Sequence, residues 1–146
     1  MDAGHGWNAG AFQHHDRELG KHGRVVVQAR LLFFVRPQRY TYEFMEKSEA
    51  FTLSFFAERY KPQLNFCGSR SGRETDKVDE CGFTVRAAEN GSVFFDEARL
   101  VLECRKLYFQ DLDPANFVDD SLMKNYPQQD FHRMYIGEIT RALIEA

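Results

Sequence analysis

The sequence predicts a single domain with a mainly β fold and short helices. Apolar runs rich in aromatic and β-branched side chains recur between polar turns, as strands do. A longer segment near residue 100 alternates apolar and polar residues, which is typical of a strand with one buried face. Fourteen Phe and six Tyr provide large side chains for a β-rich core. A chain of 146 residues allows one sizeable core and is too short for two domains.

The first half of the predicted domain alternates strands with helices. LLFFV has the composition of a buried strand and ends at Arg36 and Pro37. FTLSFF is a second strand by the same criteria. The expected elements are a strand at 31–35, a helix at 42–48 with Thr41 as its N-cap, a strand at 51–56 and a helix at 58–67.

The stretch CGSRSGRETDKVD contains a capping box, because Ser71 is followed three residues later by Glu74. This pattern predicts a helix from about Gly72 to Cys81, ended by the left-handed residue Gly82. The unpaired N–H groups at such a helix start attract anions. A capped surface helix with solvated charges has the same pattern, and the motif alone favours that alternative.

Longer strands are expected in the second half. Leu100, Leu102 and Cys104 alternate along the chain with Arg99, Val101 and Glu103, so one face of this strand is expected to be buried in a barrel interior. The expected elements here are a strand at 84–86, a turn at 89–91, strands at 94–95 and 98–109, an irregular stretch at 111–126 with a helical turn after Pro114, and a final strand at 131–146.

Charge and hydropathy exclude several function classes. The chain has 19 basic and 22 acidic residues and a net charge of -3, so it lacks the broad basic field that holds nucleic acid. Any phosphate site must therefore be local. No apolar run reaches membrane-spanning length, and the first residues lack the apolar core of a secretory signal. We expect neither a nucleic-acid partner nor a membrane.

The cysteines and histidines predict neither a disulfide framework nor a metal site. Three cysteines, none in a CxxC pair, fit a reduced, cytoplasmic protein. Cys67 and Cys104 are expected as small core residues rather than redox centres. The histidines near the start match no common metal-ligand spacing. They are His5, His14, His15 and His22.

Four stretches, in order, resemble the flavin reductase-like family: VRPQRYTYEFMEKSEAFTLSFF, FCGSRSGRETDK, FDEARLVLECRKLYFQDLDP and DFHRMYIGEI. The likeness covers most of residues 33–142. It implies an FMN-binding split β-barrel, usually a homodimer with the flavin near the subunit interface. For many members it also implies electron transfer between FMN and a nicotinamide or protein donor.

Carried over position by position, the resemblance places ten residues beside FMN. Its phosphate is expected on helix-start N–H groups near Thr41 or Ser71. A strand-end His and a core Tyr are equally good interpretations of His132 and Tyr135 near the isoalloxazine ring. No catalytic side chain is required, because hydride transfer and electron storage belong to the flavin ring. The predicted set is Arg39, Tyr40, Thr41, Ser69, Ser71, Gly72, Arg73, Lys77, His132 and Tyr135.

Three functions stay open at this point. The chain is an NAD(P)H-dependent flavin reductase, or an FMN-holding electron carrier of the flavoredoxin type that is reduced by a redox protein partner. The sequence has no dinucleotide-binding glycine fingerprint, and reductases of this barrel type do not need one. The third alternative is a non-functional, truncated or frameshifted product that cannot hold flavin.

Residues 1–32 depart from the family pattern. Family members have a flavin-contacting turn like FNTMTxSWG before the RPxRYT stretch, where this chain has QHHDRELGKHG. Displacing the reading frame by one base across this segment permits a sequence that contains FNTMTVSWG. We therefore expect a frameshifted, poorly ordered segment with the true start upstream. The domain at 33–146 would then be an incomplete barrel that lacks N-terminal strands and exposes unpaired edges.

Overall fold

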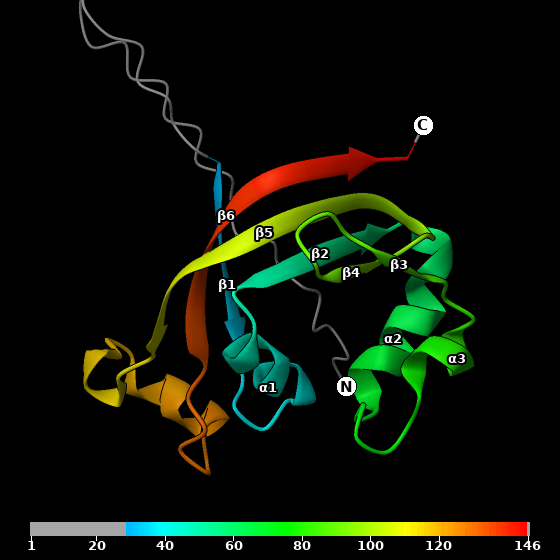
Figure 1. Cartoon of the computed structure of the whole chain (residues 1–146). Coiled ribbons are helices and arrows are strands. Elements are labelled where there is room, and N and C mark those ends of the chain that lie inside the picture. Colours follow the sequence, from blue (N-terminus) through cyan, green and yellow to red (C-terminus); the bar gives the residue numbers. More distant parts are fainter. Residues whose placement is uncertain (1–28, 146) are drawn as a thin grey trace, which may run out of the picture.

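The computed structural model describes residues 29–145, so most of the atypical first segment, residues 1–28, lies outside the described residues. The predicted mainly β class with short helices is confirmed (Figure 1). The elements are β1 (Arg30–Val35), α1 (Tyr40–Lys47), β2 (Ala50–Phe56), η1 (Glu58–Tyr60), α2 (Lys61–Ser69), α3 (Lys77–Cys81), β3 (Val85–Ala87), β4 (Val93–Phe95), β5 (Ala98–Asp111), η2 (Pro114–Asn116), η3 (Asp120–Asn125) and β6 (Arg133–Ile144).

Four strands form one antiparallel sheet in the order β1-β6-β5-β2, and β3 and β4 form a separate hairpin. Phe33 of β1 pairs with Tyr135 of β6, and Phe51 of β2 pairs with Cys104 of β5. The β5–β6 register shifts between Glu103 and Cys104 and again after Lys106. Such irregularities bend and twist a strand. The long strands β5 and β6 are accordingly curved, and the sheet curls around α1 (Figure 1).

The core lies on the inner face of this curled sheet, where α1 covers it. Cys104 is fully buried, as predicted, whereas Cys67 is only half-buried and lies outside the core. The buried cluster is Val35, Met45, Phe51, Leu102, Cys104 and Tyr135. Among residues 29–145, no helix is long and apolar enough to cross a membrane.

Both faces of the middle of β5 are buried, so the prediction of a single buried face is wrong there. Val101 and Glu103 are each 2% exposed on the outer face. The β3–β4 hairpin covers them: the Asn90 backbone N–H donates to the Glu103 carboxylate at 3.2 Å, and the Thr52 hydroxyl donates to the Val93 carbonyl oxygen. Sequence alternation could not indicate a hairpin folding back over this face.

The first helix begins earlier than predicted. α1 starts at Tyr40 with Arg39 as its N-cap, so Thr41 lies in the first turn and is not the cap. The predicted helix at 58–67 is divided into the turn η1 and the helix α2, which extends to Ser69. Pro at position 62 lies at the start of α2, where its missing N–H costs no hydrogen bond.

The predicted capping box at Ser71 does not form. α3 begins at Lys77, and the Asp76 carboxylate caps it by accepting from the N–H groups of Val78 and Asp79 at 3.1 and 3.2 Å. The Ser71 hydroxyl instead accepts from the Arg73 N–H at 3.2 Å, within a turn. An earlier helix would place a flexible Gly in its first turn, which is unfavourable. The predicted end of the helix is confirmed, since Gly82 has a φ of 65°.

Candidate functional site

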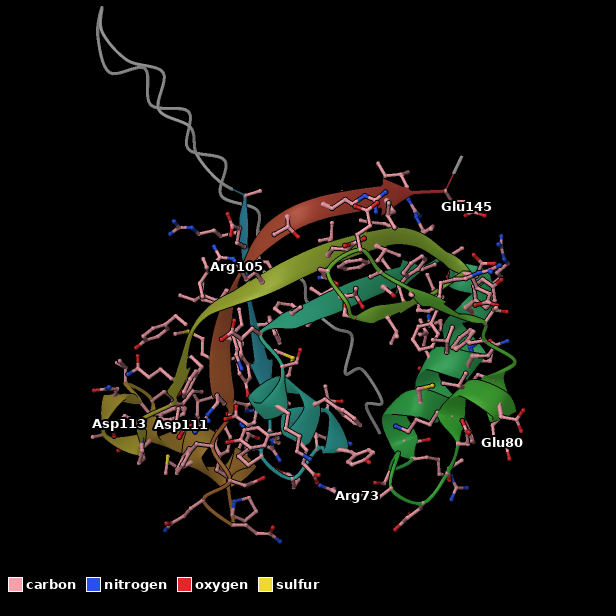
Figure 2. The ribbon with its side chains drawn as sticks, viewed as in Figure 1. Arg73, Glu80, Arg105, Asp111, Asp113 and Glu145 are labelled. Carbon is pink, nitrogen blue, oxygen red and sulfur yellow. The ribbon has the colours of Figure 1, made fainter. Side chains whose placement is uncertain are left out.

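Two stretches far apart in the sequence meet at one end of the sheet. They are residues 38–43, around the start of α1, and residues 68–77, between α2 and α3; together we call them the junction. Arg73 links them, because one guanidinium N–H donates to the Gln38 carbonyl oxygen at 3.2 Å and another pairs with Glu43. The same guanidinium lies 5.0 Å from the ring centroid of Tyr40. Figure 2 shows Arg73 between α1 and the loop.

Close packing fixes the two halves of the junction. A Cβ on Gly72 would lie 3.0 Å from Cδ1 of Tyr40, so a larger residue would push the loop away from α1. Arg39 reaches the Gly68 carbonyl oxygen at 3.5 Å. The structure therefore brings together four of the residues predicted beside FMN, namely Arg39, Tyr40, Gly72 and Arg73; their contact with FMN stays a prediction.

The start of α1 has the features of an anion site. Its N-cap, Arg39, makes no side-chain hydrogen bond to the helix. The first N–H groups of a helix have no partner within it, so those of Tyr40 and Thr41 point out of the helix end. The side chains of Arg39 and Thr41 are exposed beside them. An anion here would meet backbone donors, a hydroxyl and a guanidinium.

The start of α3 does not have these features. The Asp76 carboxylate already accepts from its first N–H groups, and its negative charge repels a phosphate. Ser69 donates to the Phe66 carbonyl oxygen at 3.0 Å, and the Lys77 ammonium donates to the Cys67 carbonyl oxygen. Of the two predicted phosphate positions, the geometry favours the one near Thr41 over the one near Ser71.

Tyr135 lies outside the junction, in the core. Its side chain is 0% exposed, its ring stacks on Phe33 at 5.3 Å, and its hydroxyl donates to the Glu46 carboxylate at 2.7 Å. Burial and the neighbouring Glu46 raise the pKa of Tyr135. The structure thus gives Tyr135 a packing role, and its contact with a flavin ring stays a prediction.

His132 also lies away from the junction, just before β6. Its Nδ1 is 2.7 Å from the Tyr126 hydroxyl, and its ring meets the edge of Phe34. Burial and then the positive charge of Arg36 lower the pKa of His132, against the opposite effect of Asp130. A neutral imidazole at physiological pH follows, and its place near FMN stays a prediction.

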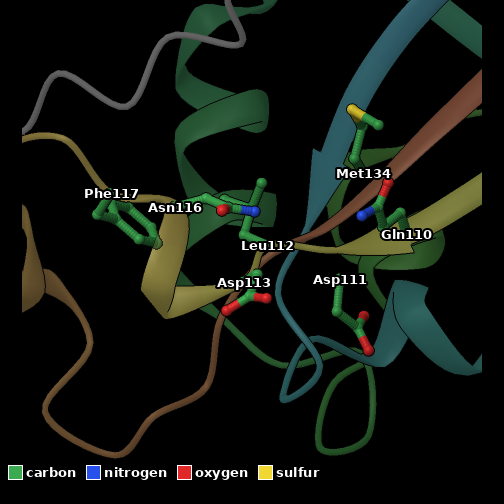
Figure 3. A pocket seen from close by; sticks show the side chains of 7 residues that line it. All are labelled: Gln110, Asp111, Leu112, Asp113, Asn116, Phe117 and Met134. Carbon is green, nitrogen blue, oxygen red and sulfur yellow. The ribbon is translucent and has the colours of Figure 1, made fainter.

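Two adjoining hollows lie where β5 ends, and α1 lies between them and the loop of residues 70–76 (Figure 1). The smaller, of about 220 Å³, is shown in Figure 3 and has both acidic and apolar side chains. The larger, of about 560 Å³, reaches Pro37, immediately before the junction. The smaller hollow is lined by Gln110, Asp111, Leu112, Asp113, Asn116, Phe117 and Met134.

Two residues of the junction were missed by sequence reasoning. Glu43 pairs with the Arg73 guanidinium, and Gln38 accepts from Arg73 through its carbonyl oxygen. An acidic residue in the first turn of α1 was a usable signal for Glu43, because it complements the helix dipole and attracts a nearby cation. The contact of Gln38 uses only its backbone, so no side-chain pattern could have indicated it.

Comparisons with known proteins identify relatives of this chain. A family model described as the flavin reductase like domain matches residues 27–146. No curated protein sequence matches the chain.

Solved structures share its fold. A flavoredoxin from Methanosarcina acetivorans is 24% identical with a TM-score of 0.64, covering 81% of this chain and 54% of that one. An FMN-binding protein from Thermus thermophilus is 21% identical with a TM-score of 0.61, at 81% and 56% coverage. A split-barrel flavin reductase candidate from Shewanella frigidimarina is 17% identical with a TM-score of 0.62, at 81% and 52%. The chain thus has the split-barrel fold and spans about half the length of these structures.

Proposed function

The chain belongs to the flavin reductase-like domain family, and from this premise we propose that it binds FMN and passes electrons between NAD(P)H, or a reduced protein, and the bound flavin. The observation that carries the proposal is the junction. It has a helix start without a side-chain cap, flanked by Arg39 on one side and by Arg73 on the loop. This combination of backbone donors and guanidinium groups suits a phosphate monoester.

The residues of the junction would act by holding the cofactor. Arg39 and the N–H groups at the start of α1 would bind the phosphate, and Thr41 would add a hydroxyl donor. Arg73 would keep the loop of residues 70–76 against Tyr40. In the free protein its positive charge is paired with Glu43, and in the complex the guanidinium would turn to the phosphate. FMN supplies the hydride and electron chemistry when bound, which requires no acid or base from the chain.

FMN titration, followed by quenching of flavin fluorescence, tests the site. We expect Arg39→Ala and Arg73→Ala each to weaken binding about 10- to 100-fold, since a charge-assisted hydrogen bond contributes about 1.5–3 kcal/mol. Arg70→Ala is the matched control. Arg70 is exposed at the end of α2 and makes no side-chain hydrogen bond or ion pair within the part of the chain that the structure describes. An equal loss of FMN affinity in all three variants would show that the junction is not the phosphate site.

The titration should be made on two proteins: the chain as given, and one in which FNTMTVSWG replaces the corresponding part of residues 1–32. The displaced-frame hypothesis stays a prediction, because residues 1–28 lie outside the described residues. Weak binding in the first protein and tight binding in the second would support it. Tight, stoichiometric binding in both would reject the hypothesis and leave the FMN proposal intact.

The electron donor separates the two enzyme-like alternatives. Steady-state oxidation of NADH or NADPH with added FMN would identify a reductase. Reduction of bound flavin only by a redox protein would identify a flavoredoxin-like carrier. We also propose a cytoplasmic location, which the three free cysteines support.

We further propose that the chain forms a homodimer. The outer sheet face carries Leu32, Phe34 and Tyr108, which are 41%, 43% and 47% exposed. Leu32 and Tyr108 both pair with Ile136 of β6, so these side chains form one apolar surface. Light scattering of the wild-type chain and of Leu32→Lys tests this: we expect a dimer that the substitution weakens, and a wild-type monomer would contradict it.

A further inference from the structure

We propose that Cys67 and Cys81 form a reversible intramolecular disulfide that restrains the loop between α2 and α3. Their Sγ atoms lie 3.5 Å apart, and both side chains are half-buried. Cys67 lies in the last turn of α2, and Cys81 is the last residue of α3. A bond between them would join the two helices across residues 70–76. The inference does not depend on FMN binding.

The local structure can close this bond with a small movement. A disulfide is about 2.05 Å long, so the sulfurs must approach by about 1.5 Å. Neither α2 nor α3 contains a buried residue, and α3 has only five residues before the left-handed Gly82. Neither helix therefore holds a core side chain of its own that a small shift would displace. The Cys81 thiol also contacts the Gln63 carbonyl oxygen at 3.7 Å, which keeps it on the side of α2 that carries Cys67.

Each thiol of the pair must lose its proton before its sulfur can attack another sulfur. Burial, together with the hydrogen bond and charge of Cys81, raises the pKa of the Cys67 thiol to about 11, although the Lys77 ammonium acts in the opposite direction. Cys67 is therefore almost always protonated at neutral pH, and the thiolate is the reactive form of cysteine.

A low-molecular-weight disulfide such as oxidised glutathione is a sufficient oxidant. One thiol of the pair loses its proton to solvent, and its thiolate attacks one sulfur of the oxidised glutathione. The S–S bond breaks, and one glutathione thiolate leaves and takes up a proton. The other thiol then loses its proton to solvent and attacks the first cysteine sulfur, and the second glutathione leaves as a thiolate that takes up a proton. Two protein thiols are oxidised by two electrons, and one glutathione disulfide is reduced to two thiols.

The bond would restrain the loop that carries Arg73. In the reduced protein, α2 and α3 meet through the two sulfurs and the hydrogen bond from Lys77 to the Cys67 carbonyl oxygen. A covalent bond between Cys67 and Cys81 limits how far the loop can open. Trypsin needs an opened backbone at Arg70 or Arg73, so oxidation should slow cleavage at these sites severalfold.

The experiment treats the full chain with oxidised glutathione and then counts thiols under denaturing conditions. We expect one free thiol, from the buried Cys104, in place of three, with a mass loss of about 2 Da and no covalent dimer. Dithiothreitol should restore three thiols and the original rate of tryptic cleavage. Three remaining thiols, a stable glutathione adduct, or a disulfide between chains would each overturn the proposal.

Two single variants keep the test independent of folding defects. Cys67→Ser and Cys81→Ser replace sulfur by a similarly sized hydroxyl at half-buried positions, so both should fold, as circular dichroism would verify. Neither should lose mass on oxidation, and neither should show slower cleavage at Arg70 or Arg73. An intramolecular disulfide in either variant would assign the bond to Cys104 and overturn the proposal.

Discussion

The ring of Phe51 packs directly against the backbone of Gly137. A Cβ added to Gly137 would lie 2.7 Å from Cζ and 3.2 Å from Cε1 of that ring. Phe51 belongs to β2 and Gly137 to β6, and β5 runs between these strands. The Phe51 side chain therefore crosses the inner face of β5 and fills the space that Gly137 leaves open.

Gly137→Ala should destabilise the domain by about 1–3 kcal/mol, because overpacking a well-filled core forces side chains and backbone to move. Urea unfolding followed by circular dichroism measures the change. Gly68→Ala is the control, since a Cβ at Gly68 meets nothing within 4 Å and α2 gains a better helix former. A loss of stability at Gly68 equal to that at Gly137 would contradict the steric explanation.

The order of the main strands was predictable from sequence, because their side-chain patterns are local. LLFFV and FTLSFF became β1 and β2 within one residue of the expected bounds, and the alternating segment became β5. The left-handed Gly82 was predictable too, since a glycine after a helical run commonly ends it.

The start of α3 and the second buried face of β5 were not predictable from local patterns. Ser71 and Asp76 are both good N-caps, and only the folded loop decides that Asp76 is used. The charge of Glu103 gives no sign of burial in the sequence, but in the fold the Asn90 N–H and Arg141 donate to its carboxylate under the β3–β4 hairpin. The meeting of Arg73 with Tyr40 depends likewise on tertiary structure.

Arg141→Ala should destabilise the protein by about 1–3 kcal/mol, because it leaves the carboxylate of Glu103 with one donor fewer in a buried position. Glu103 is 2% exposed and accepts from Arg141 at 3.3 Å. Arg59→Ala is the control: its contact with Glu145, at 3.9 Å, joins two exposed side chains and should contribute little to stability. Comparable losses in thermal unfolding would show that burial of Glu103 does not matter.

Tyr135→Phe should cost about 0.5–1.5 kcal/mol, because the hydroxyl donates to Glu46 in the core while the ring packing is kept. Tyr108→Phe removes a similar bond, to Gln110, from an exposed ring and should change stability little. Denaturant unfolding of both variants measures the difference. An unchanged free energy of unfolding in Tyr135→Phe would indicate that a water molecule replaces the hydroxyl as the donor to Glu46.

Stability should fall on acidification because Arg133 holds two carboxylates in their charged form. Its guanidinium binds Asp111 at 2.6 Å and Glu46 at 2.9 Å. The hydrogen bond from Arg133 lowers the pKa of Asp111; burial alone would raise the pKa of Glu46, but the bonds from Tyr135 and Arg133 lower it overall. A carboxyl whose pKa is lower in the folded state stabilises the protein above its unfolded pKa of about 4, and this contribution disappears as the pH falls through the folded value.

Asp111→Asn should therefore reduce the free energy of unfolding at about pH 7, by less than about 1 kcal/mol since Asp111 is 57% exposed, and make little difference near pH 2. Urea unfolding across this range measures the effect, with the exposed Glu80→Gln as control; a deficit in Asp111→Asn that persists unchanged at low pH would show that the ion pair is not its cause.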